Sequence, residues 1–242
     1  MKDYLKDLID HTHGLGVDLI KVTGTDTETC INARTEDKSV IISGTFKHPI
    51  SDFIGVFGMP NLGKLKTIIG FDDYDENSKI YVTKTQRDGV EIPGAIHFET
   101  STGDFINDYR LMLKSVVEEK VGNSKFKGTT WQVEFEPTVA GVMRLKKQSQ
   151  ANSEERTFTT KTDNNDLKFY FGDPSTHSGN FVFQPQVQGT LNNTWMWPVK
   201  EFISIMDLVG DKIVRVADAG AMEIIVDSGL ATYRYLIPAQ TK

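Results

Sequence analysis

The chain has 242 residues, a formal net charge of −6, and hydrophobic and charged fractions of 38% and 25%. This composition is ordinary for a globular protein and excludes disorder along the whole chain. No apolar run approaches the roughly 20 residues that a membrane span needs, and the beginning of the chain has no apolar segment typical of a secretory signal. The single cysteine, Cys30, cannot form an internal disulfide, which favours a reducing compartment. We therefore expect a cytoplasmic protein (in the host cytoplasm if the source is viral) with no membrane partner.

An internal repeat organises the chain. Apolar residues at i, i+3, i+6 and i+7 predict a short amphipathic helix over 60–69, and the same spacing recurs 140 positions later over 198–209. A second helix pair is predicted over 2–13 and 138–150, where three apolar residues repeat after 134 positions. The repeated residues are Leu62, Leu65, Ile68 and Ile69 with Phe202, Ile205, Leu208 and Val209, and Leu5, Leu8 and Ile9 with Val139, Val142 and Met143.

Segments rich in β-branched and alternating residues follow each helix and predict strands. Each half therefore reads helix, strands, helix, strands, without alternating β-α-β units, which favours an α+β fold of two similar domains, each with antiparallel sheets and two helices on one face. We expect domains at 1–113 and 130–242, joined by a polar, glycine-containing connector at 114–129. The expected strands lie at 17–23, 27–33, 40–46, 80–85, 90–92, 95–99, 157–162, 167–171, 181–187, 213–217, 222–226 and 231–237, and the apolar runs at 57–60 and 195–198, just before two of the helices, are also strand-like.

The basic residues are concentrated on the predicted helices. The four helices contain eight bases and five acids, a net charge of +3, whereas the remainder of the chain carries −9. Helices gathered on one surface would give an acidic protein a mildly basic face that binds phosphates without reading sequence. Ordinary solvated helix faces are the alternative explanation. The candidate DNA-binding residues are Lys2, Lys6, Lys64, Lys66, Arg144, Lys146, Lys147 and Lys200.

The duplicated order of elements resembles the DNA sliding clamps, in particular those of T-even-like bacteriophages and the two-domain clamps of eukaryotes and archaea. Residues 5–9 (LKDLI) look like the first helix of the two-domain clamps, and residues 53–65 (FIGVFGMPNLGKL) look like the strand and second helix of the phage clamps. Residues 232–239 (TYRYLIPA) resemble the final strand and tail of the two-domain clamps. The resemblance covers nearly the whole chain, and the duplicated layout carries it more than any single motif.

The resemblance implies the DNA-clamp fold and a closed ring, a homotrimer of two-domain chains around duplex DNA, with helices lining the hole. Such a ring tethers the replicative DNA polymerase and raises its processivity without catalysis of its own. The family also implies a clamp-loader ATPase as a partner, and the phage clamps serve late transcription, which makes late-transcription factors a further candidate class. We expect no catalytic residue, no metal and no cofactor.

The resemblance also implies a hydrophobic pocket near the connector and the last strand, where partners dock short peptides. Ordinary core or strand packing is the alternative explanation for each residue that could line it. The candidates on this chain are Ile41, Ile42, Leu113, Val116, Leu236, Ile237 and Pro238.

Two other functions remain open at this stage. Residues 58–64 (GMPNLGK) fit the first seven positions of a phosphate-binding P-loop, but the next residue is Leu65 where a Ser or Thr is needed. Pro60 would also remove an amide from the phosphate cradle, so a nucleotide-dependent enzyme is the weaker alternative. The other is a phage structural or assembly protein, which could equally be a symmetric β-rich oligomer.

Overall fold

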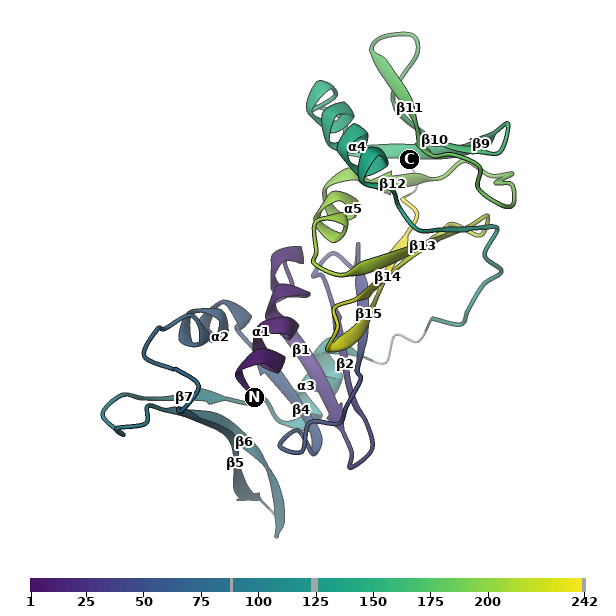
Figure 1. Ribbon diagram of the computed structural model, residues 1–242. Helices are drawn as coiled ribbons and strands as arrows, with labels where there is room; N and C mark the ends of the chain where they lie inside the picture. Colours follow the sequence, from purple (N-terminus) through teal and green to yellow (C-terminus); the bar gives the residue numbers. More distant parts are fainter. Residues whose placement is uncertain (88, 123–125, 241–242) are drawn as a thin grey trace. The chain divides into compact units, whose positions relative to one another are not determined.

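The computed structural model describes residues 1–87, 89–122 and 126–240, and its chain forms two compact units (Figure 1). Unit 1 comprises residues 1–36, 42–125 and 228–233, and unit 2 comprises residues 37–41, 126–227 and 234–242. The main boundary between the two units, after residue 125, falls within the predicted connector at 114–129. Residues 123–125 of this connector lie outside the described part. The last strand contributes its first residues to unit 1 and the rest to unit 2.

Unit 1 has antiparallel sheets. The strand order in one is β4-β1-β2-β3 followed by the start of β15 (Ala231–Pro238), and in the other it is β5-β6-β7. The elements are α1 (Lys2–Asp10), a 3-10 turn (His13–Leu15), β1 (Leu19–Gly24), β2 (Thr29–Arg34), β3 (Ile41–Phe46), β4 (Gly55–Pro60), α2 (Leu62–Ile69), β5 (Lys79–Arg87), β6 (Val90–Glu99), β7 (Ile106–Arg110) and α3 (Lys114–Val121).

The sheet around β4 is covered on both faces. A Cβ atom added at Gly58 would lie 2.9 Å from Cγ2 of Val117, so α3 packs directly on this strand. Phe57 and Met59, which alternate with Gly58 and point to the opposite face, are also buried. The first part of the predicted connector is thus the helix α3, which packs on unit 1.

Helices α1 and α2 pack beside each other in unit 1 (Figure 1). Asn61 begins α2, because its side-chain oxygen accepts a hydrogen bond from the Lys64 amide. The predicted apolar faces of both helices are confirmed, since all their repeated residues are buried: Leu5, Leu8, Ile9, Leu62, Leu65, Ile68 and Ile69.

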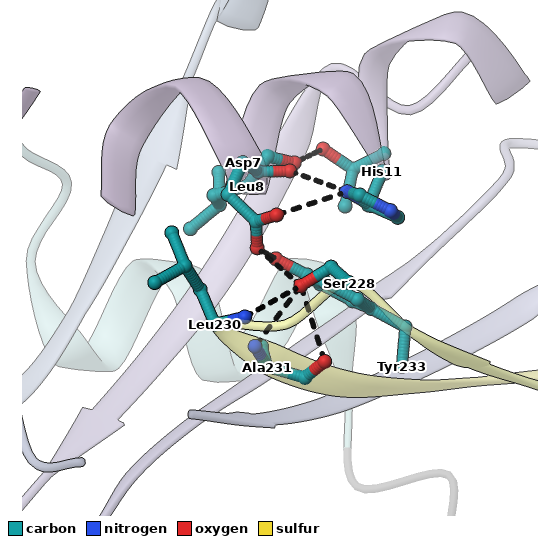
Figure 2. A network of polar contacts seen from close by, with 8 residues as sticks. Asp7, Leu8, His11, Ser228, Leu230, Ala231 and Tyr233 are labelled. Carbon is teal, nitrogen blue, oxygen red and sulfur yellow. Dashed lines mark hydrogen bonds and ion pairs between the residues drawn. The ribbon is translucent and has the colours of Figure 1, made fainter. Parts of the chain in front are cut away.

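A polar network ties α1 to the start of β15 inside unit 1 (Figure 2). Asp7 accepts hydrogen bonds from the hydroxyls of Tyr233 and Ser228. The ring of His11 stacks on that of Tyr233 with centroids 4.6 Å apart. Residues from the two ends of the chain therefore share one buried site in this unit.

Unit 2 repeats the same plan. Its sheets have the strand orders β11-β10-β9-β12 and β15-β14-β13-β8. The elements are β8 (Val133–Phe135), α4 (Val139–Ala151), β9 (Thr157–Asp163), β10 (Asp166–Gly172), β11 (Ser178–Gln184), β12 (Met196–Pro198), α5 (Val199–Met206), β13 (Asp211–Ala217), β14 (Ala221–Asp227) and the remainder of β15.

Stacked phenylalanines form the core of unit 2. The ring of Phe169 stacks on Phe158 and Phe183, with centroids 4.5 and 4.2 Å apart, and Phe202 of α5 meets all three edge-on. Each ring is at most 1% exposed, so these contacts add to the large apolar area that the rings bury. The pairing places strands β9 and β10 inside their sheet and leaves β11 and β12 at its ends.

The apolar face predicted for α4 is wrong. Val139 and Met143 are 82% and 51% exposed, and the helix instead buries Gly141 and Leu145. A Cβ atom at Gly141 would lie 2.3 Å from the carbonyl oxygen of Phe183, so the helix approaches β11 where it has no side chain. The 134-residue repeat in the sequence is consequently not the structural repeat of these two helices.

The helix α5 is shorter than the helix predicted over 198–209. Phe202 and Ile205 are buried as expected, but α5 ends at Met206, which leaves Val209 in the following turn, 79% exposed. The short strands β7 and β8 and the helix α3 were not predicted. No helix in the described part of the chain is long and apolar enough to cross a membrane.

Candidate functional site

Most of the candidate DNA-binding side chains are exposed on the helices. In unit 1, Lys6 of α1 and Lys64 and Lys66 of α2 are exposed. In unit 2, exposed bases occupy α4 and α5: Arg144, Lys147 and Lys200. Each unit therefore presents exposed cations on both of its paired helices, as binding to phosphates requires. Among them, the Arg144 guanidinium also donates a hydrogen bond of 3.4 Å to the carbonyl oxygen of Val182.

The other two candidates are less exposed and are bonded within their units. Lys2 donates a hydrogen bond to the backbone carbonyl of Tyr74. Lys146 forms an ion pair with Asp207, which follows α5 and caps its end. A phosphate would have to compete with these partners, so Lys2 and Lys146 contribute less to an anion-binding surface than the six exposed bases. Asp207 is one of the five acids of the predicted helices, but its pairing with Lys146 was not predicted.

The observed helix bounds strengthen the charge asymmetry. Asp207 lies outside α5, so the four helices contain eight bases and four acids, a net charge of +4. The rest of the chain then carries −10. One of the four acids, Asp7, is turned into the network with Tyr233 and Ser228, which removes a carboxylate from the helix surface.

The residues predicted for the partner pocket differ in exposure. Ile42 and Ile237 are fully buried and serve the cores of their units. Ile41, Leu113 and Leu236 are half-buried, whereas Val116 and Pro238 are exposed. Only these last five have surface to offer a partner, and their grouping into one pocket stays a prediction.

The P-loop-like segment is a strand-to-helix turn. Its strand, β4, pairs antiparallel with β1, whereas a phosphate-binding loop follows a strand of a parallel sheet. The Lys64 amide, which a phosphate would need, bonds to the Asn61 side chain. The Pro60 carbonyl accepts a hydrogen bond from the Tyr109 hydroxyl. The hydrogen bonds of this segment therefore stabilise the beginning of α2.

No set of three or more His, Cys, Asp or Glu side chains in residues 1–87, 89–122 and 126–240 is arranged to hold a metal ion. In the acidic run that follows α2, Asp75 accepts hydrogen bonds from the amide of Asn77 and the hydroxyl of Ser78. These bonds lower the pKa of the Asp75 carboxyl, the amide of Asn77 having the largest effect. The run therefore forms a turn stabilised by its own side chains.

Solved structures match the chain over its whole length. An A. fulgidus PCNA bound to the C-terminal region of FEN-1 superposes with a TM-score of 0.71 at 9% identity, covering 100% of this chain and 96% of that one. The fold is that of the sliding clamps. The proliferating cellular nuclear antigen of Entamoeba histolytica (TM-score 0.67, 11% identity, 99% and 94% covered) and the PCNA of Thermococcus kodakaraensis (0.65, 10%, 99% and 95%) agree. The resemblance seen in the sequence is thereby confirmed at the level of the clamp fold. No protein-family model and no curated protein matches the sequence.

The two units arrange their helices in the same way. Both units carry their first and second helices as a packed pair, since α1 lies beside α2 and α4 beside α5. The exposed bases of each unit thus occupy equivalent elements of the repeat. The antiparallel α+β class predicted from the order of elements is also confirmed.

Proposed function

We propose that this protein is a sliding clamp that encircles duplex DNA and tethers a replicative DNA polymerase, raising its processivity without catalysis of its own. The observation that carries the proposal is the clamp fold over the full chain, duplicated in two units whose helices concentrate the bases of an acidic protein. We place its action at the replication fork, in the cytoplasm.

The exposed bases suit a ring that moves along DNA. Lysine and arginine side chains on helix surfaces attract phosphates without contacting base edges, so no sequence fixes the position of the protein. The net charge of −10 outside the helices would disfavour DNA on the outer surface of a ring. Lys6, Lys64, Lys66, Arg144, Lys147 and Lys200 are the residues we assign to the DNA side.

The repeat suggests how copies of the chain associate. In unit 1, the third strand after the first helix, β3, is followed in the sheet by the start of β15, the third strand after α5. The corresponding strands, β11 of unit 2 and β7 of unit 1, each lie at the end of a described sheet. Pairing β11 of one copy with β7 of the next would repeat the same arrangement head to tail, and a head-to-tail interface that closes gives a ring. We propose three copies, the number that the resemblance to two-domain clamps implies.

Partners follow from the same proposal. The A. fulgidus PCNA was solved with the C-terminal region of FEN-1, so a protein of this fold holds a peptide of another protein. We propose that this chain holds peptides of its polymerase, its clamp-loader ATPase and, in a phage, late-transcription factors. The candidate residues for this binding are Ile41, Ile42, Leu113, Val116, Leu236, Ile237 and Pro238.

Retention on circular and linear DNA tests the topological mechanism. The protein is loaded by its clamp loader onto nicked circular DNA, and one half of the sample is linearised with a restriction enzyme. We expect the clamp to remain on the circle and to slide off the free ends of the linear form. Equal retention on both would refute encirclement, and a structural or assembly protein would show no loader-dependent binding to either.

Sedimentation supplies the independent check of the ring. We expect the unmodified chain to sediment as a trimer. The substitution Ile106→Asp, which places a charge at an exposed apolar position of β7, should give a smaller species. Val90→Asp, at the beginning of β6, changes an exposed apolar side chain of the same sheet and should leave the trimer intact. A monomeric unmodified chain at micromolar concentration would refute the ring.

A further inference from the structure

A cluster of charged side chains in unit 1 surrounds His97, in the middle strand of the sheet β5-β6-β7. Its Nδ1 lies 2.9 Å from Oδ1 of Asp108 on β7, and its Nε2 lies 3.2 Å from Oε2 of Glu99. A neutral imidazole has one N–H and can donate to only one of two carboxylates, whereas an imidazolium donates to both. The geometry is therefore that of the protonated ring, which satisfies both carboxylates at once.

The bases that face His97 keep their charge near neutral pH. On β5, Tyr81 lies directly opposite His97, with the two rings 5.1 Å apart, and Lys79 lies two positions away on the same side of the strand. On β7, the exposed Arg110 lies on the same side as Asp108. Lysine and arginine stay charged well above neutral pH, whereas histidine titrates near it. The hydrogen bond to Asp108 raises the pKa of His97, so the proton is lost at a higher pH than in an isolated histidine.

The loss of this proton affects the two carboxylates differently. Asp108 forms its ion pair with His97. Glu99 also pairs with Lys79, at 2.8 Å. When the imidazole becomes neutral, Glu99 keeps the charge of Lys79 beside it, but Asp108 loses the charge of its partner. The Asp108 side chain is 48% exposed, so within a single copy of the chain water compensates for most of this loss.

The position of Asp108 matters because β7 lies at the end of its sheet and is the strand that we assign to the junction between copies. The strand proposed to pair with it, β11 (Ser178–Gln184), contains no charged residue. No register of the two strands therefore brings a cation directly opposite Asp108. On the next strand, β10, Lys168 is already paired with Asp163. The junction thus offers no replacement for the charge of the imidazolium on these strands.

One helix base does contact β11, since Arg144 donates a hydrogen bond to the carbonyl oxygen of Val182. Arg144 comes from α4, which packs beside α5 over the face of the sheet on which Phe183 is buried. Asp108 precedes the buried Tyr109 and so lies on the opposite, exposed face of β7. In a ring that keeps its helices on one face of the joined sheets, Arg144 and Asp108 therefore lie on opposite faces.

We propose that His97 makes closure of the ring depend on pH, so that the junction at β7 is strong while the imidazole is protonated and weakens when the proton is lost. The inference rests on the proposed ring and adds a condition that opens it. Joining β7 to another copy removes water from the Asp108 carboxylate, and a carboxylate without a counter-charge costs more there than in the free copy. This cost is absent below the pKa of His97 and appears as the pH rises through it.

Sedimentation velocity over a range of protein concentrations, near pH 6 and near pH 9, tests the inference on the full chain without DNA. An exposed ion pair contributes little, so we expect about a threefold change for each junction and about tenfold or more in the dissociation constant of the trimer, which is larger at the higher pH. His97→Gln should give the weaker trimer at both pH values. Asp108→Asn, which leaves no carboxylate to compensate, should give the stronger trimer at both. His48→Gln changes an exposed histidine of unit 1 and should keep the pH dependence of the unmodified chain.

The opposite effects expected for the two variants separate charge from the mere loss of a contact. If the hydrogen bond between His97 and Asp108 only shaped β7, both substitutions would weaken the trimer alike, and that result overturns the inference. A trimer of the unmodified chain with the same dissociation constant at both pH values overturns it as well, while leaving the ring intact. Monomers at every pH and concentration would refute the proposed ring itself, and this inference with it.

Discussion

The hydroxyl of Tyr233 donates a hydrogen bond of 2.7 Å to Oδ2 of Asp7, joining residues 226 positions apart. Both residues belong to unit 1, so the beginning of β15 helps to hold α1 in the unit that the first half of the chain builds. Unit 1 is therefore complete only after nearly the entire chain has been made.

Removal of this hydroxyl should destabilise unit 1. We expect Tyr233→Phe to lower the free energy of unfolding by about 1.5–3 kcal/mol, the range for a hydrogen bond to a carboxylate, because the Asp7 side chain is only 10% exposed. Urea denaturation at fixed protein concentration measures the change. Tyr4→Phe, on the same helix, is the control and should change stability by less than about 0.5 kcal/mol. A similar loss in both variants would show that the Asp7 bond is not the cause.

His97 should make stability depend on pH. Its Nδ1 lies 2.9 Å from Asp108 on β7, and its Nε2 lies 3.2 Å from Glu99, which also bonds to Lys79 on β5. The hydrogen bond to Asp108 raises the pKa of His97, with a smaller contribution from Glu99. A raised pKa in the folded state means that the charged pair stabilises the protein fully below the unfolded pKa of about 6.5, and that this stability is lost as the pH rises through the folded pKa.

The expected difference is modest because Asp108 is 48% exposed. We expect His97→Gln to cost about 0.5–1 kcal/mol near pH 6 and almost nothing near pH 9. Urea denaturation at both pH values measures it. His48→Gln, which changes an exposed histidine of the same unit, should leave the pH dependence unaltered. A loss for His97→Gln that is equal at both pH values would contradict an ionic contribution.

The sequence predicted helices and strands well where a single face is buried. The spacing of Leu62, Leu65 and Ile68 reflects one buried side of α2, and such a pattern is visible without the structure. Strand β1 was predicted at 17–23, but the burial of the consecutive residues Ile20, Lys21 and Val22 shows that both of its faces are covered. The helix that covers one of them, α3, buries only Val117 and Val121, too few apolar residues to distinguish it from a linker.

The error in α4 has a definite physical cause. A helix that approaches a strand closely does so through a glycine, so its buried face contains Gly141, which a search for apolar residues overlooks. The exposed Val139 and Met143 then resemble a core face. The pairing of Lys146 with Asp207 in the candidate site was likewise not predicted, because it depends on where α5 ends.

The close approach at Gly141 can be tested with a pair of alanine substitutions. Gly141→Ala places a methyl group 2.3 Å from the Phe183 carbonyl oxygen, so we expect a loss of about 1–3 kcal/mol in the free energy of unfolding. Gly63→Ala in α2 meets nothing closer than 3.6 Å and should stabilise by about 0.5–1 kcal/mol through helix propensity. Denaturation of both variants decides the point, and stabilisation by both would mean that α4 does not touch β11 at Gly141.

Neutralising Arg144 and Lys147 should weaken DNA binding in a way that depends on salt. Both are exposed on α4, whereas Lys146 pairs with Asp207 and is left unchanged to keep the contact between the helices. Each phosphate contact contributes about 0.9 to the slope of log affinity against log salt, so the double alanine variant should reduce that slope by about 1–2. Fluorescence anisotropy with a short linear duplex measures it. A second double variant, Lys84→Ala with Lys161→Ala, removes equal charge from the strands β5 and β9 and should leave the slope unchanged. Equal slopes for the two double variants would show that α4 does not face DNA, because net charge alone would then account for the change.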